Sequence, residues 1–327
     1  MLTLFFILAF IFVFLNGLND SANIVATVIS SRALQPRAAL LLTALGEFIG
    51  PFLFGVAVAR SLGADLFDPA SVNIEMLISA LTGALLWRVV TWYLGIPASS
   101  SHALMGGLVG AAWAASGPAA IQLPGLGKIA IALLVSPPLG LIVGYLVTRV
   151  IFLLARWATP RLNRTFQRLQ LLTSFGLALG HGSNDAQKTM GILVLGLIAA
   201  GELNEFSVPT WVLVTSATGM ALGTAFGGWR VIRTLGGRIM KVRPVHGFAA
   251  QLGGLGVMWG AAFLGGPVSL TQVMSSSIVG AGAAQRLKGV RWQVAREMLA
   301  AWLLTFPVSA LVAGGSYWLL NLVFSIN

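Results

Sequence analysis

The chain has 327 residues, of which 57% are hydrophobic and only 9% are charged, and its mean hydropathy is +0.88. A soluble domain carries roughly 25% charged residues, so this composition excludes a water-soluble globular protein and indicates an integral membrane protein. The sequence contains no cysteine, which excludes disulfides and thiolate-bound metals. The net charge of +11 does not indicate nucleic-acid binding, because the basic residues fall in short loops between apolar segments.

A helix needs about 20 apolar residues to cross the hydrocarbon core, and on that measure the sequence predicts an all-α protein with about ten crossings. The first segment lacks the charged start and cleavage site of a signal peptide, so we expect a true span there. Several segments are short and rich in Gly or Pro, which predicts broken or re-entrant helices. The predicted crossings are 2–30, 38–60, 75–94, 97–115, 128–153, 171–199, 210–229, 245–265, 268–285 and 298–321.

The loops on the two sides differ in charge. The loops on one side collect most of the arginines and lysines, and the opposite loops hold the acidic residues, with Arg60 and Lys128 as basic exceptions. Because basic loops stay in the cytoplasm, we expect a plasma-membrane protein with both termini outside and a basic cytoplasmic linker at 156–168. Arg88, near the inner end of its span, is expected to extend toward the membrane surface.

Two motifs occur in both halves of the chain, in the same order and at similar spacing. NDSAN at 19–23 aligns with NDAQK at 184–188, and PASSSH at 97–102 aligns with PVSLTQ at 267–272. Five crossings per half is an odd number, so the second copy is predicted to be inverted. We therefore expect two inverted-topology repeats, 1–155 and 169–327, an architecture typical of transporters.

The first motif places acids inside the membrane. A carboxylate at that depth costs several kcal/mol, so Asp20 and Asp185 in matching positions favour a function over a residue buried beside a lysine. Carboxylate and amide oxygens suit Na⁺, with a possible site at Asp20 and Asn23, and a carboxylate can instead carry a proton. The residues predicted to bind a coupling ion are Asn19, Asp20, Asn23, Glu47, Asn184 and Asp185.

The second motif combines a proline with hydroxyl residues. Proline is well placed at a helix start, and the following hydroxyls and free N–H groups lie at the positive end of the helix dipole. Two opposed helix starts would bind a tetrahedral oxyanion, although each serine alone would suit an ordinary cap. The predicted substrate-binding residues are Asp20, Ser99, Ser100, Ser101, Asn184, Asp185, Lys188, Ser269 and Thr271.

Further polar residues lie at membrane depth. Lys188 occupies the position that Asn23 has in the first half; it either neutralises Asp185 or supplies a fixed positive charge, for the anion or in place of one Na⁺, which favours proton coupling. Glu47 either titrates during coupling or makes a hydrogen-bonded helix contact. His102 and His181 are expected to be hydrogen-bonded structural residues rather than proton relays.

The stretches GLNDSAN (17–23), HGSNDAQK (181–188), IPASSSHALMGGLVGA (96–111) and GPVSLTQVMSSSIVGAG (266–282) resemble the inorganic phosphate transporter (PiT) family. The resemblance covers the whole chain. It implies a symporter that moves inorganic phosphate with Na⁺ or H⁺, an inverted-repeat fold, a homodimer, and phosphate and ion binding by the motif residues named above.

The chain departs from the family at several positions. Gln187 and Lys188 stand where Na⁺-coupled members tend to have Ala-Asn, which argues against a second Na⁺ site. Leu270 replaces a hydroxyl residue and Gln272 replaces a histidine, which weakens the second anion site.

The alternatives to a phosphate symporter are a sulfate permease, a passive anion channel and a membrane enzyme. Phosphate is favoured because a carboxylate can accept a proton from phosphate, whereas sulfate has none at neutral pH. Polarity concentrated in paired central clusters favours alternating access over a channel. No nucleotide-binding or catalytic motif is evident, so we expect neither an enzyme nor a cofactor besides the coupling ion.

Overall fold

The computed structural model describes residues 1–67, 71–157 and 162–324, and these are almost entirely helical. Two 3₁₀ turns, η2 (Pro118–Ala120) and η3 (Leu287–Gly289), join the longer elements. The α-helices are α1 (Leu2–Ser30), α2 (Pro36–Leu53), α3 (Ala57–Gly63), α4 (Ile74–Leu94), α5 (Ser100–Ser116), α6 (Leu123–Leu154), α7 (Leu162–Ala199), α8 (Thr210–Phe226), α9 (Trp229–Gly237), α10 (Pro244–Leu264), α11 (Leu270–Gln285) and α12 (Trp292–Phe324).

Six of the described helices are long and apolar enough to cross a membrane: α1, α2, α4, α6, α10 and α12. Helix α7 is continuous over 38 residues, but polar side chains interrupt its apolar sequence. Helices α5, α8 and α11 have only 16 or 17 residues. Each predicted crossing overlaps one or two helices, so the all-α, multi-pass class is confirmed. The number of complete crossings remains a prediction.

The helices differ from the predicted crossings in three main respects. The expected crossing 38–60 is divided into α2 and α3, because Gly55 takes a left-handed conformation with φ of 70°. Helix α9 was not predicted, since its arginines indicated a loop. Helix α7 begins at Leu162, so part of the expected linker 156–168 is helical, and residues 158–161 lie outside the described part of the chain.

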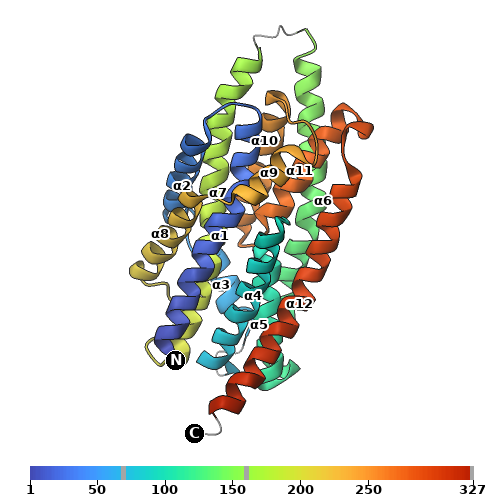
Figure 1. Cartoon of the computed structure of the whole chain (residues 1–327). Coiled ribbons are helices and arrows are strands. Elements are labelled where there is room, and N and C mark those ends of the chain that lie inside the picture. The colour runs from blue at the N-terminus through green and yellow to red at the C-terminus, as the bar shows by residue number, and fades with distance from the viewer. Residues whose placement is uncertain (68–70, 158–161, 325–327) are drawn as a thin grey trace.

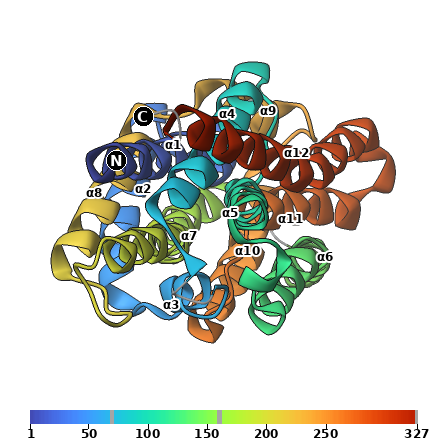
Figure 2. The ribbon, with the colours of Figure 1, turned by 90° about the horizontal axis from the view of Figure 1, so that it is seen from below.

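The chain forms one elongated bundle in which the N-terminus and the C-terminal end of α12 lie at the same end (Figure 1). Seen along the bundle, α6 and α8 lie at opposite edges, whereas α5, α7, α10 and α11 lie nearer the middle (Figure 2). Helices from different halves of the sequence pack together: α1 on α8, α7 on α2, α5 on α12, and α11 on α6. Motifs distant in sequence are thereby brought to the centre.

Two similar loops lead into the short helices α5 and α11. Gly95 directly follows α4 and Gly265 directly follows α10, with φ of 68° and 66°, conformations that favour glycine. A proline follows two residues later in each loop, Pro97 and Pro267. The sequence therefore stops one helix and starts the next at equivalent places in the two halves.

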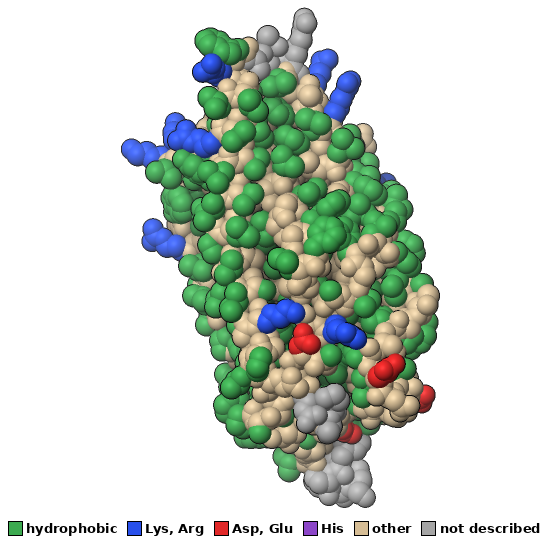
Figure 3. All heavy atoms as spheres, turned by 180° about the vertical axis from the view of Figure 1, so that it is seen from behind, with side chains coloured by type: hydrophobic (Ala, Val, Ile, Leu, Met, Phe, Trp, Pro, Cys, Tyr) green, Lys and Arg blue, Asp and Glu red, His purple; other side chains and the backbone are tan. Residues whose placement is uncertain are grey.

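The molecular surface supports a membrane location. Hydrophobic side chains cover most of the face in Figure 3, basic side chains project from the end opposite the termini, and acidic side chains gather toward the end with the termini. Large apolar side chains on α6 and α12, such as Leu153 and Leu311, are more than half exposed. Such a surface suits contact with lipid rather than water.

We expect Gly50→Ala to destabilise the protein. A Cβ atom at Gly50 would lie 2.1 Å from the backbone oxygen of Leu179, so α2 and α7 would have to move apart. Overpacking of this kind costs about 1–3 kcal/mol. The unfolding temperature in detergent checks this, with Gly256→Ala as a control, because a Cβ there meets nothing within 4 Å. Equal unfolding temperatures for the two variants would contradict the tight helix crossing.

Candidate functional site

The structure brings the two Asn-Asp motifs together inside the bundle. Asp20 on α1 and Asp185 on α7 are 2% and 0% exposed. Together with His181 they offer ligand atoms that all lie within 4.8 Å of one another. Because buried carboxylates need compensating partners, the surrounding residues define the site.

The carboxylate of Asp20 is held by Thr271 and Arg88, and Asn23 supports Thr271. Thr271 Oγ1 donates a hydrogen bond to Asp20 Oδ1 at 3.1 Å, and Asn23 Nδ2 donates to Thr271 Oγ1 at 3.0 Å. Arg88 Nη2 lies 3.5 Å from Asp20 Oδ1 and donates to the backbone oxygen of Leu15 at 3.1 Å. The expectation that Arg88 extends to the membrane surface is therefore wrong: it is 2% exposed, because α4 packs on α1 and turns it toward Asp20.

Asp185 has more partners than Asp20. Lys188 Nζ contacts its Oδ1 atom. Asn16 Nδ2 and Ser100 Oγ both donate to Asp185 Oδ2 at 3.4 Å, and His181 Nε2 lies 3.3 Å from the same oxygen. The carboxylate of Asp185 is thus satisfied by groups from α1, α5 and α7.

Lys188 is almost completely buried, with 1% exposed. Besides Asp185, its Nζ atom donates to Ser101 Oγ at 2.6 Å and to the backbone oxygen of Val268 at 2.7 Å. Neutralisation of Asp185, one of the two expectations for Lys188, is therefore observed. The contact with Ser101 and Val268 also ties α7 to both helix starts.

Glu47 is connected to Asp185 through His181. Glu47 Oε1 lies 2.6 Å from His181 Nδ1, and its other oxygen contacts the hydroxyl of Thr224. Thr224 Oγ1 lies 3.0 Å from the backbone oxygen of Gly17. His181 is hydrogen-bonded as predicted, and it joins two acids that are distant in sequence.

The hydroxyl motifs divide into caps and site residues. Ser99 Oγ accepts from the backbone N–H of His102 at 3.1 Å, and Ser269 Oγ accepts from that of Gln272 at 3.4 Å, so both serines cap their helices. Ser100, one residue after the first cap, contacts Asp185, and Thr271, two residues after the second cap, contacts Asp20. The two helix starts also meet directly, because Ser101 Oγ donates to the backbone oxygen of Val268 at 3.1 Å.

Several amide oxygens in the cluster remain available. Asn184 donates through Nδ2 to the backbone oxygen of Gly266 at 3.0 Å, but its Oδ1 atom has no hydrogen-bond partner. Buried amide oxygens of this kind are hard ligands for a small cation. Among the described residues, the buried amide oxygens without a partner belong to Asn16, Asn19, Asn23, Asn184 and Gln272.

Three residues of the site, Asn16, Arg88 and Thr224, were not among the predicted site residues. Arg88 carried a signal, since an ionisable residue inside a span is a functional candidate. Asn16 precedes Asp20 by one helical turn, so helical spacing places it on the same face. Thr224 gave no comparable signal, because its role depends on the packing of α8 beside α1 and α2.

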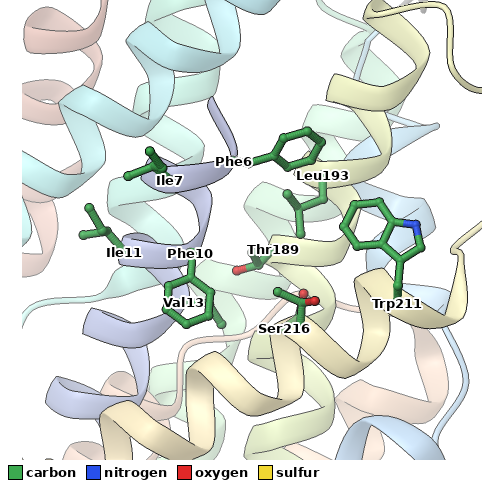
Figure 4. Close-up of a pocket in the computed structure, with 10 residues that line it drawn as sticks. Phe6, Ile7, Phe10, Ile11, Val13, Thr189, Leu193, Trp211 and Ser216 are labelled. Carbon is green, nitrogen blue, oxygen red and sulfur yellow. The ribbon is translucent and has the colours of Figure 1, made fainter. Parts of the chain in front are cut away.

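Two hollows lie near these residues. The first, lined by Asn19, Asp20, Arg88 and Thr271 among others, has room for about one water molecule. The second, of about 480 Å³, lies among α1, α7 and α8 and is lined mainly by apolar side chains such as Phe10 (Figure 4).

Residues 16–313 match the model of the phosphate transporter family. The chain belongs to this family. It is 42% identical to a probable low-affinity inorganic phosphate transporter of Bacillus subtilis, with 97% of this chain and 96% of that protein covered. It is 44% identical to a protein of the same description from Rhizobium meliloti, with 96% and 95% covered.

A solved structure described as the sodium-dependent phosphate transporter has the same fold. The TM-score is 0.90 at 25% sequence identity, with 98% of this chain and 99% of that chain covered. The phosphate transporter family is thus confirmed by sequence and fold. The chain is a membrane transporter rather than an enzyme, and the sulfate permease alternative finds no support in these relatives.

We expect Arg88→Met to destabilise the transporter strongly. Removal of one partner from a buried pair leaves the other charge uncompensated and costs about 3–5 kcal/mol. The double variant Arg88→Met with Asp20→Asn removes both charges and should recover most of that loss. Unfolding in detergent measures both effects.

The control is Lys128→Met, which breaks the pair of Lys128 with Asp65. That pair spans 3.6 Å and its side chains are 49% and 42% exposed, so its loss should cost at most about 1 kcal/mol. An Arg88→Met variant no less stable than this control would show that Asp20 does not depend on Arg88.

Proposed function

We propose that this transporter is a secondary symporter that moves inorganic phosphate with protons, and that the phosphate binds between the two halves at the buried cluster. The observation that carries the proposal is the charge composition of the cluster. The three carboxylates of the cluster, Asp20, Asp185 and Glu47, carry a formal charge of −3. Arg88 and Lys188 carry +2, so the net charge of the cluster is −1 when His181 is neutral. A net charge at membrane depth is costly, so the cluster favours one additional positive charge.

His181 is suited to hold that charge as a proton. Its Nδ1 atom faces Glu47 Oε1 at 2.6 Å, and its Nε2 atom faces Asp185 Oδ2 at 3.3 Å. A neutral imidazole has one donor and one acceptor nitrogen, whereas an imidazolium has two donors. His181 Nε2 makes no hydrogen bond to Asp185 at this distance, so the support for proton coupling is electrostatic: a protonated ring would place its positive charge between the two carboxylates.

Sodium coupling is the second candidate. The amide oxygens of Asn19 and Asn23, one on each side of Asp20, have no partner. Together with the Asp20 carboxylate they would suit one Na⁺. Arg88, which already compensates Asp20 at 3.5 Å, makes this candidate the weaker one.

The phosphate site in this proposal is formed by the starts of α5 and α11. Phosphate oxygens would accept hydrogen bonds from free backbone N–H groups at these positive helix ends. A protonated phosphate oxygen can donate to an acid, which sulfate cannot do at neutral pH. The proposed substrate contacts are Asp20, Ser99, Ser100, Ser101, Asn184, Asp185, Lys188, Ser269 and Thr271, with Ser99 and Ser269 acting mainly as caps.

Transport would proceed by alternating access. Helices α1–α6 and α7–α12 recur in order with similar lengths: α4 and α10 have 21 residues each, and α6 and α12 have 32 and 33. This recurrence supports two inverted repeats, 1–155 and 169–327, joined by the basic segment 156–168. The small hollow beside Asp20 would open when the repeats move against each other, which a passive channel would not require.

The orientation follows from charge. The basic side chains at the end opposite the termini (Figure 3) support a plasma-membrane location with the termini outside. We also propose a homodimer in the lipid bilayer. A role in nucleic-acid binding is not proposed, since the basic residues belong to the membrane orientation.

The proposal predicts that a pH gradient drives phosphate uptake. In proteoliposomes given either an inward proton gradient or an inward Na⁺ gradient, labelled phosphate should follow the proton gradient. Excess unlabelled phosphate should compete, whereas sulfate should not. Uptake that follows Na⁺ and ignores pH would contradict proton coupling, and competition by sulfate would contradict the proposed selectivity.

Asp20→Asn and Asp185→Asn should each abolish most coupled uptake. Each change removes a charged acceptor, and a hydrogen bond to a charged group contributes about 1.5–3 kcal/mol, or roughly 10- to 100-fold in rate. Uptake per inserted protein is the measurement, and Asp65→Asn, at an exposed pair, is the control. Normal uptake by either cluster variant would remove the central role of these acids.

A further inference from the structure

The contacts of Lys188 are those of a bound cation. Three oxygens surround its Nζ atom: a carboxylate oxygen of Asp185, the hydroxyl of Ser101 at 2.6 Å and the backbone carbonyl of Val268 at 2.7 Å. Carboxylate, hydroxyl and carbonyl oxygens are also the ligands that small hard cations take in proteins. With the side chain 1% exposed, water does not compete for this position.

The contacts of Lys188, Asp185 and Ser101 form one half of the site, which we call a half-site. The first motif forms a similar half-site, in which Asn23 takes the position of Lys188. Asn23 follows Asp20 by three residues, as Lys188 follows Asp185. Asn23 Nδ2 lies 3.0 Å from Thr271 Oγ1, just as Lys188 Nζ lies beside the hydroxyl of Ser101. Each half-site thus combines an acid, a hydroxyl from the start of a short helix, and a third side chain, which is an amide in one and an ammonium in the other.

We propose that the Lys188 ammonium permanently takes the place of a monovalent coupling cation in the second half-site, so that this position cannot load or release an ion during transport. The inference rests on the proposed symport function and specifies which half-site is closed to exchange. A tethered charge moves with the protein and is not delivered across the membrane. The transporter would therefore have one exchangeable cation site fewer than one with an amide at this position.

The inference predicts that shortening Lys188 to an amide creates a Na⁺ site. In Lys188→Asn, the Asp185 carboxylate, the Ser101 hydroxyl and the Val268 carbonyl would remain, joined by the amide oxygen introduced at 188. The cluster charge would fall by one unit, and a buried charge of that kind requires compensation. One carboxylate among neutral oxygens suits a monovalent ion such as Na⁺.

Phosphate uptake by Lys188→Asn should become dependent on Na⁺. For a site with a Kd of about 10 mM, raising external Na⁺ from about 1 to 100 mM increases occupancy, and hence uptake, about tenfold. Potassium replaces Na⁺ at constant ionic strength. The wild type and Lys128→Asn should show no such increase; Lys128 also pairs with an acid and a serine, but at the surface.

A second measurement covers a variant that folds but does not transport. Purified Lys188→Asn should unfold at a higher temperature in NaCl than in KCl, and the wild type should not. The inference would be overturned if Na⁺ increased neither the uptake nor the unfolding temperature of Lys188→Asn. Equal effects of Na⁺ and K⁺ on this variant would also overturn it. Absence of phosphate uptake by the wild type would instead overturn the proposed function, so the two failures are distinguishable.

Discussion

Charge compensation inside the membrane is the constraint on which the structure depends. Asp20, Asp185 and Glu47 are all buried, and each would be costly without partners. Arg88 compensates Asp20, while Lys188 and His181 compensate Asp185. The acids and these partners lie on four helices, α1, α2, α4 and α7. The bundle must therefore close around the acids to compensate them, and displacement of any one partner alters the charge of the whole cluster.

Close helix contacts make this arrangement possible. A Cβ at Gly17 would lie 2.0 Å from the backbone oxygen of Met220, and one at Gly182 would lie 2.3 Å from that of Glu47. Glycines at these crossings let α1 approach α8 and let α7 approach α2. Since Gly17 and Gly182 each precede an Asn-Asp motif, the same turns that permit the close packing also carry the acids into the centre.

Much of the site was predictable because the sequence repeats it. Asp20 and Asp185 stand out as acids in apolar segments, and two matching motifs predicted that they meet. The bounds of α1 were also predicted to the residue. The depth of Arg88 was evident from the sequence, but its direction was not, because depth in a span does not determine which neighbour a side chain faces. The link from Glu47 to Asp185 was likewise hidden, since it depends on tertiary packing around His181. The amphipathic α9 was missed because its basic residues are equally typical of a loop.

The same charge balance constrains the transport cycle under the proposed function. Without substrate, a cluster sum of −1 is neutralised by one proton. Binding of phosphate as its monoanion restores a net charge of −1, which a second proton would neutralise. The net charge of the cluster would then be near zero in both the loaded and the unloaded state when the transporter changes conformation. The two states would differ by one proton and one phosphate. Since Lys188 and Arg88 contribute fixed charges to both states, they reduce the number of ions that must bind without changing this difference.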